Sequence, residues 1–379
     1  MKKTLVAIAA LAATSAFAQS TVTVSGIMNY GVHKSADGLT TYGALKGDRS
    51  KINFNVVEDM EGGTKALAMA EIRFNSANGA AYYNDTANSS ASAKGASLME
   101  QAMVGLSDKT LGTVKFGRFT NVIGVYDFST FEDSKYGTNA SLASYGRLSA
   151  QAQYDSPAFM GFTASALSAS KSANKYAAGY GWGPVDSVDY SANSATGYRD
   201  MNAIALTYVN GPLAAQLSRI NGLYNDTNNK FGINYTTSVG KFYYGYYKQN
   251  GDVGSVTTDL TAAYATPGTA FANTNTAGKA TGVAEHTAQE IGAYIPYGKF
   301  GFRAGYVRNN KDVVVNVTDG STKATKVALG AEYSFSKRTM VIAQHAKVNN
   351  GAVTANASVG AGFGYTTGSM SFLGLQHSF

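Results

Sequence analysis

Apolar side chains recur at every second position in many segments of this chain. In 51–57, isoleucine, phenylalanine and valine alternate with lysine and asparagine, and in 147–155 leucine, alanine and tyrosine alternate with arginine, serine and glutamine. A period of two is that of a β-strand, whose successive side chains point to opposite faces. Leu373, Leu375 and Phe379 continue the alternation to the last residue. The pattern predicts strands with one apolar face and one polar face.

Short and long connections alternate between these strands. The short turns are EDMEGGT, SDKTLGT, DSPAFMG, VNGPL, SVGK, IPYGK and FSKR, and the longer polar segments are 35–46, 76–95, 120–146, 169–198, 222–227, 250–285, 309–323 and 349–368. Seven turns and eight longer segments predict about sixteen strands, with the two ends meeting to close the sheet. An even strand number with short turns at one end is typical of outer-membrane barrels, and this size leaves an aqueous lumen. We therefore predict an all-β fold, a transmembrane antiparallel β-barrel of about sixteen strands.

The N-terminus has the features of a secretory signal peptide. Met1 is followed by two lysines, a short apolar run from Leu5 to Ala13, and a cleavage motif that ends at Ala18. Nine apolar residues are too few for a membrane anchor, which takes about 20. We expect residues 1–18 to be removed during export and residues 19–379 to form a single barrel domain.

Composition excludes several other classes of protein. The chain has no cysteine, and its net charge of +7 falls to +5 once Lys2 and Lys3 leave with the signal peptide. No lysine- or arginine-rich stretch indicates nucleic-acid binding. The four histidines are scattered without metal-ligand spacing, and GAGFG at 360–364 lacks the strand–turn–helix context of a dinucleotide loop. We predict neither an enzyme nor a cofactor or metal site.

Five stretches of the sequence resemble landmarks of the Gram-negative general porins, most closely those of β-proteobacterial type. They are STVTVSGIMNYGV, SKINFNVVEDMEGGTKALAMAE, QAMVGLSDKTLGTVKFGR, RLSAQAQYDSPAFMGF and LGLQHSF, and they follow the family's order from Thr21 to Phe379. The resemblance implies an outer-membrane homotrimer that lets small hydrophilic solutes and ions diffuse passively. It also implies contact with lipid and lipopolysaccharide, and a terminal Phe379 that the barrel-assembly machinery reads.

The resemblance further implies a pore constriction in which the third long loop folds inside the barrel. That loop follows KFGRF, and the candidates for its acidic side are Asp127, Glu132 and Asp133. The candidates for the basic wall are Lys51 and Arg147 by motif, Arg49 beside Lys51, and Lys115 and Arg73 from alternation alone. Alternation predicts that Lys51 and Arg147 point inward, because Ile52, Phe54, Leu148 and Ala150 should face lipid.

Two positions depart from the family pattern and affect the expected ion preference. Glu100 and Gln101 stand where relatives often carry arginine, and Lys51 replaces an arginine. Opposed charges across a narrow aqueous gap create a transverse field, and their net sign sets ion preference. We expect a general diffusion porin with weak to moderate anion preference. The alternatives are a substrate-selective channel for oligosaccharides, phosphate or organic anions, and an adhesive surface protein, which would leave the polar strand face unexplained.

Overall fold

A computed structural model describes eleven parts of the chain. They are residues 20–36, 38–45, 50–77, 79, 99–122, 147–170, 200–221, 227–250, 282–315, 318–349 and 368–379. The predicted signal peptide, residues 1–18, lies outside the described residues. Its cleavage therefore stays a prediction.

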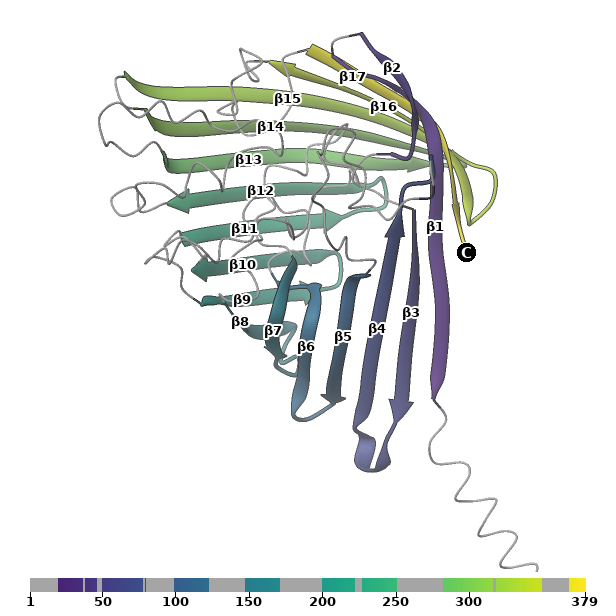
Figure 1. Cartoon of the computed structure of the whole chain (residues 1–379), viewed down its shortest axis with the longest axis vertical. Coiled ribbons are helices and arrows are strands. Elements are labelled where there is room, and N and C mark those ends of the chain that lie inside the picture. Colours follow the sequence, from purple (N-terminus) through teal and green to yellow (C-terminus); the bar gives the residue numbers. More distant parts are fainter. Residues whose placement is uncertain are drawn as a thin grey trace, which may run out of the picture.

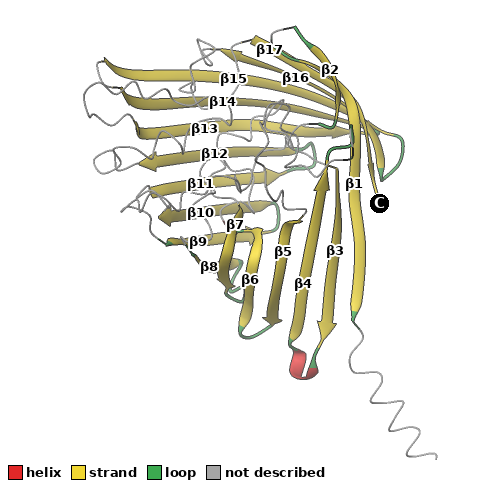
Figure 2. Ribbon diagram, in the orientation of Figure 1, coloured by secondary structure: helices red, strands yellow, loops and turns green. Residues whose placement is uncertain are grey.

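The described residues form seventeen β-strands and one short 3-10 helix, η1 (Glu61–Gly63), in the turn between the third and fourth strands (Figure 2). The strands are β1 (Thr21–Lys34), β2 (Thr40–Gly43), β3 (Ser50–Asp59), β4 (Lys65–Phe74), β5 (Met99–Asp108), β6 (Gly112–Thr120), β7 (Arg147–Asp155), β8 (Phe162–Ala169), β9 (Met201–Asn210), β10 (Leu213–Asn221), β11 (Thr227–Thr236), β12 (Lys241–Asn250), β13 (Gly282–Tyr297), β14 (Phe300–Val315), β15 (Thr318–Ser334), β16 (Thr339–Asn349) and β17 (Gly368–Ser378). Among the described residues, no helix is long and apolar enough to cross a membrane.

The strands close into one antiparallel ring. From β3 onward each strand pairs with the next in the chain, and β17 pairs with β1 over eight residues (Figure 1). β2 and β3 share one edge of β1, where β2 pairs with residues 31–34 and β3 with residues 21–27. The two therefore act as one interrupted strand, and the ring has sixteen positions. The prediction of a closed barrel of about sixteen strands is confirmed.

The interruption between β2 and β3 results from extra residues on one side of the pairing. Gly31 pairs with Gly43 and Ile27 with Lys51, so seven residues on one strand face three on the other. Leu45, within this excess, is buried, and its backbone N–H donates to Oδ1 of Asn29 at 2.8 Å. The sequence predicted a plain loop over 35–46, and the strand pairing of β2 corrects that prediction.

The connections follow the predicted alternation with one further exception. All seven short turns join consecutive strands where the sequence placed them. The predicted loop over 309–323 is wrong, because β14 continues to Val315 and β15 begins at Thr318. The run of three valines that ends at Val315 is β-branched and favours extended backbone. The hairpin therefore extends through the segment predicted to be irregular.

The outer face of the ring is apolar and exposed. Large side chains at alternate positions are among the most exposed of the described residues, such as Val104, Ile204, Leu217, Leu329 and Leu373. The residues between them on the same strands point inward and are largely buried. In a soluble protein this much contiguous apolar surface would drive association. The arrangement instead fits a barrel whose outside contacts lipid.

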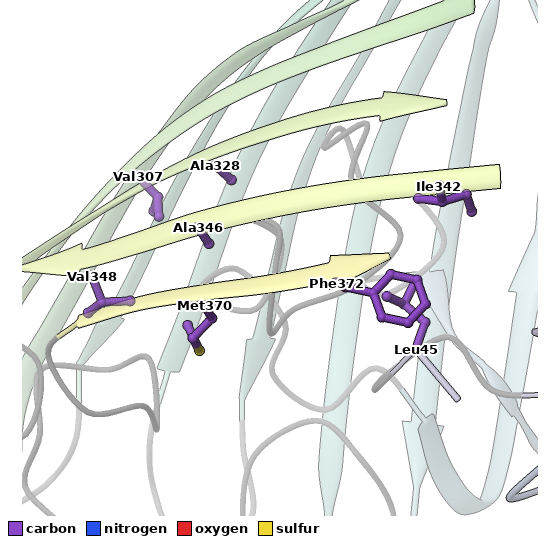
Figure 3. Close-up of a cluster of buried hydrophobic side chains, with 8 residues drawn as sticks. All are labelled: Leu45, Val307, Ala328, Ile342, Ala346, Val348, Met370 and Phe372. Carbon is purple, nitrogen blue, oxygen red and sulfur yellow. The ribbon is translucent and has the colours of Figure 1, made fainter. Parts of the chain in front are cut away.

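The inner face is less polar than alternation predicted. One buried apolar cluster lines β14 to β17 and includes Val307, Ile342, Met370 and Phe372, with Leu45 packed against it (Figure 3). A second lines the inside of β7 to β10. Buried polar side chains occur around most of the ring, but the buried charged ones lie on β4 and β5 and on β11 to β15. The charged part of the wall is therefore confined to sectors of the ring.

The seam between β1 and β17 is held by an aromatic ring on each face. Outside, a Cβ at Gly26 would lie 2.3 Å from Cζ of Phe379, so the ring rests on the bare glycine. Gly26 and Phe379 also exchange backbone hydrogen bonds of 2.9 and 3.0 Å. Inside, the ring of Phe372 lies over Gly31 and Gly374 in the same way. The final residue therefore belongs to the closing ladder.

We expect Gly26→Ala to weaken closure of the barrel. The new methyl group would meet the Phe379 ring and the Lys51 carbonyl oxygen, and overpacking of this kind costs roughly 1–3 kcal/mol. Thermal unfolding in detergent, read as the gel shift of the folded barrel, should show a lower midpoint. Gly43→Ala is the control, because its Cβ would meet only ordinary contacts at 3.9 Å. Equal midpoints for the two variants would contradict the seam described here.

Candidate functional site on the lumen wall

The structure places only part of the predicted constriction. Lys51, Arg73 and Lys115 lie on β3, β4 and β6 and are described in full. Arg147 is the first residue of β7, and only its backbone is described. The remaining candidates, Arg49, Asp127, Glu132 and Asp133, lie outside the described residues. The three described cations can therefore be examined, and the opposition of wall and loop stays a prediction.

Lys51 and Arg73 are neighbours because they pair across β3 and β4. Glu71 lies two residues before Arg73 on the same face, and it receives both cations. Nζ of Lys51 lies 3.7 Å from Glu71 Oε2, and Nε of Arg73 donates to Glu71 Oε1. Glu100 on β5 adds a second carboxylate, 3.7 Å from Nη1 of Arg73. We call these four side chains the charge cluster.

Burial decides which members of the charge cluster can meet a solute. The side chains of Glu71, Arg73 and Glu100 are 5% exposed or less, whereas that of Lys51 is 23% exposed. The cluster holds two cations and two carboxylates, so it is neutral as a whole. Arg73 is therefore a counter-ion for two buried acids, and Lys51 is the member of the cluster that water reaches.

Sequence reasoning did not identify Glu71, and it noted Glu100 without predicting its partner. Glu100 was recognised as replacing a family arginine, but its contact with Arg73 was not predicted. The signal for Glu71 was present, since it precedes Arg73 by two residues in AEIRF and so shares its face. A glutamate beside an arginine on one strand face should be considered as its counter-ion.

Lys115 is likewise paired. Its Nζ lies 2.7 Å from Oδ2 of Asp155 and 5.4 Å from the ring centroid of Phe119. Asp155 Oδ1 also accepts hydrogen bonds of 2.7 Å from Ser165 Oγ and from Gln153 Nε2. This second group, on β6 to β8, is again neutral. Each of the three described cations of the predicted basic wall therefore contacts a carboxylate.

Behind these ion pairs, the chain turns inward as it leaves β6. The backbone N–H of Thr120 donates to Gln101 Oε1 at 2.7 Å, and that of Val122 donates to Gln153 Oε1 at 2.9 Å. Gln151 Nε2 donates to the carbonyl oxygen of Phe119 at 2.5 Å. Val122 is buried in the apolar cluster on the inside of β7 to β10. Sequence reasoning named Gln101 only as standing where relatives often carry arginine, and it assigned none of the three glutamines to this turn.

Leu148 corrects the argument that placed Arg147. Alternation predicted that Leu148 faces lipid, but Leu148 is 1% exposed and packs in the inner cluster with Val122. Ala150 has a φ of 47°, in the left-handed region, and the pairing of β6 with β7 shifts register between Gly117 and Phe119. This irregularity reverses the alternation between Leu148 and the inward-facing Gln151. The prediction for Leu148 is wrong, and Arg147 loses that support.

A further charged group lies on the inside of β13 to β15. Nη1 of Arg303 is 2.7 Å from Oε2 of Glu332, and the hydroxyl of Tyr294 donates to Oε1 of the same carboxylate at 2.8 Å. The guanidinium also lies 4.9 Å from the centroid of the Tyr294 ring. The described residues contain no cluster of side chains suited to hold a metal ion. In each of these three charged groups, every cation therefore contacts a carboxylate.

These features together define a class of protein. A closed ring satisfies every strand's backbone hydrogen bonds within the ring, which is the condition for crossing a membrane with strands. Apolar side chains cover its outside, and polar and charged groups line its inside. The fold is therefore that of a transmembrane β-barrel with a polar lumen wall.

Comparisons with known proteins identify the family. The sequence pattern of the Gram-negative porin family matches residues 4–353, so the chain belongs to that family and is an outer-membrane porin. An outer membrane porin protein of Bordetella pertussis is 27% identical over 249 residues, a match that spans 58% of this chain and 59% of the length of that relative.

Solved structures share the fold at low sequence identity. An anion-selective porin from Comamonas acidovorans superposes with a TM-score of 0.63 at 20% identity, covering 95% of this chain and 100% of that one. The outer membrane protein OmpT of Vibrio cholerae gives 0.61 at 13% identity, covering 95% and 98%. These likenesses show the fold, and the resemblance stated from sequence motifs is confirmed.

We expect Arg73→Met to destabilise the barrel far more than Lys51→Met. Removing Arg73 takes away the cation that contacts both buried acids and leaves Glu71 only the more distant Lys51, and breaking a buried pair of this kind typically costs about 3–5 kcal/mol. Removing Lys51 leaves Glu71 with Arg73 and costs less than about 1 kcal/mol for a partly exposed pair. Urea unfolding in detergent, followed by circular dichroism, measures both. A larger loss for Lys51→Met would show that the charge cluster is misassigned.

Proposed function

We propose that this porin forms a water-filled channel through which small hydrophilic solutes and ions diffuse passively. The observation that carries the proposal is the closed ring of sixteen positions with a charged inner wall. Barrels of this strand number enclose an aqueous channel, whereas smaller ones are filled by side chains. Membership of the Gram-negative porin family supports the same conclusion.

The channel prefers anions weakly. Lys51, whose side chain is 23% exposed, lies 3.7 Å from the Glu71 carboxylate, whereas Lys115 forms a closer pair with Asp155 at 2.7 Å and Arg73 is buried between two acids. A partly exposed lysine gives a local positive potential without the strength of a row of free arginines. The solved porin from Comamonas acidovorans with the same fold is described as anion-selective, which favours this sign.

The constriction lies where the chain turns inward after β6. Residues 120–122 are fastened to the inner wall and Val122 is buried there, which supports a third connection that enters the barrel. In this proposal the acids Asp127, Glu132 and Asp133 of that connection oppose Lys51, Arg49 and Arg147. Arg73 and Lys115 contribute to the wall only through their counter-ions.

The proposed partners are lipid, lipopolysaccharide, the barrel-assembly machinery and two further copies of the chain. Four cations point outward and are exposed in the half of the barrel opposite the short turns: Lys34, Arg219 and Lys347 near the ends of their strands, and Arg308 at the middle of β14. Their charge complements the phosphates of lipopolysaccharide. Phe379, exposed on the outer face of the last strand, remains accessible to the assembly machinery.

A substrate-selective channel is less well supported. Such a channel needs exposed aromatic or arginine side chains along the lumen, and the stretch KFYYGYYKQN at 241–250 is rich in tyrosine. Tyr243 and Tyr247 of that stretch point inward, but each is only 3% exposed. The hydroxyl of Tyr247 donates to Asn228 Oδ1. These rings offer a sugar little surface for stacking.

Planar-bilayer recording tests the channel and its selectivity together. Lys51→Gln with Arg147→Gln should shift the reversal potential toward cations, and neutralising the three loop acids should shift it toward anions. A change of ~1.4 kcal/mol in local potential alters relative ion occupancy tenfold. Both shifts should shrink in molar salt, where the screening length falls from ~8 to ~3 Å.

Arg308→Gln is the matched control, because Arg308 points away from the lumen. It should leave the reversal potential unchanged. If neither lumen variant differs from the control in dilute KCl, these residues do not line the constriction. Conductance that saturates with one solute class would favour the selective channel, and an absence of conductance would favour an adhesive role.

A further inference from the structure

We propose that two relays of carboxylate and glutamine fix the inward turn at residues 120–122, and that Arg73 and Lys115 are positioning residues of these relays. The relays run from the charge cluster through Gln101 to Thr120, and from Lys115 through Asp155 and Gln153 to Val122. The turn they hold is the point at which the proposed constriction begins. The consequence for ion flow therefore rests on the proposed function, whereas the relays themselves do not.

The first relay passes through Gln101 on β5. Its Nε2 donates to Glu71 Oε2 at 3.0 Å, and its Oε1 accepts the Thr120 N–H at 2.7 Å. An ionised carboxylate can only accept, so the amide nitrogen must face Glu71. The amide oxygen is then left for the backbone. Arg73 holds the Glu71 carboxylate in place through its own contact with Oε1.

The second relay repeats this arrangement on β7. Gln153 Nε2 donates to Asp155 Oδ1 at 2.7 Å, and Gln153 Oε1 accepts the Val122 N–H at 2.9 Å. Lys115 lies 2.7 Å from the other oxygen of Asp155. Two carboxylates on different strands thus orient two amides toward backbone donors two residues apart.

The turn at residues 120–122 is shielded from water where it packs against the barrel wall. Asn121, between the two bound residues, is fully buried, and Val122 packs with Leu148 in the inner apolar cluster. Gln151 adds a third hydrogen bond, to the carbonyl oxygen of Phe119. Hydrogen bonds are stronger in the low dielectric of a protein interior. A buried backbone N–H or C=O group without a hydrogen-bond partner costs free energy there. The wall therefore determines the direction in which the chain leaves β6 as far as Val122.

Cysteine accessibility tests the relays without reference to channel activity. The chain has no cysteine, so Val122→Cys introduces a single thiol at a buried position. In the folded barrel this thiol should react slowly with a water-soluble maleimide, and rapidly after unfolding in urea. Adding Gln153→Leu or Gln101→Leu removes one anchor. Loss of one hydrogen bond should increase the population of molecules in which the turn is open. The labelling rate should rise with that population, roughly fivefold.

Two further variants separate positioning from a general loss of stability. Asp155→Asn does not touch residues 120–122, but it frees the Gln153 amide to rotate, so labelling should also rise. Gln216→Leu is the matched control. Gln216 is buried on the inner wall like Gln153, but its Nε2 donates to Oγ1 of Thr207 at 3.1 Å, away from residues 120–122. Labelling in Gln216→Leu should match that of the V122C parent.

The outcomes are distinct. Labelling that stays at the control rate in both glutamine variants overturns the relays, and so does rapid labelling of V122C in the otherwise unchanged chain. Channel recordings of the same proteins then test the link to the pore. We expect the glutamine variants to visit additional conductance levels while the reversal potential stays unchanged, because no charge is altered. If labelling responds but no protein conducts, the relays stand and the proposed channel fails.

Discussion

Backbone hydrogen bonding is the constraint on which the rest of this structure depends. A strand that crosses lipid has no water to satisfy its N–H and C=O groups, so the last strand must pair with the first. β17 and β1 meet this requirement over eight residue pairs, and Gly26 and Phe379 extend the ladder to the end of the chain. Glycine at the seam leaves room for an aromatic ring on each face, Phe379 over Gly26 outside and Phe372 over Gly31 and Gly374 inside. Closure of the ring therefore gives Phe379 a packing role.

Closure also places charged side chains inside a wall that is only one residue thick. A buried charge there is tolerated when it is paired, and Arg73 with Glu71 and Glu100 shows how the chain meets that condition. In the proposed relays Glu71 has a second use, because its carboxylate also accepts the hydrogen bond that orients the Gln101 amide toward Thr120. Wall stability and pore geometry thus share residues. A substitution aimed at selectivity in this sector would alter both.

The sequence was sufficient for the architecture because a period of two and alternating connection lengths are local signals. It was insufficient at Leu148, where a left-handed residue at Ala150 reverses the alternation without any glycine or proline to mark it. It also missed Glu71, since counter-ions are chosen across strands and depend on register. The valines before 315 carried the correct local preference, but the polar residues around them suggested a loop. The residue pattern of a single strand does not show which strands pair or in which register.

The long hairpin of β14 and β15 makes the mouth of the barrel uneven. Its ladder continues for seven residue pairs beyond Arg308 and Thr325, which at about 3.4 Å per residue is roughly 24 Å of ordered backbone. Figure 1 shows the two strands reaching past β12 at this end. Paired strand backbone therefore stands higher along one part of the rim than along β12. A solute that approaches from that side reaches the pore more directly over the lower part of the rim than over this hairpin.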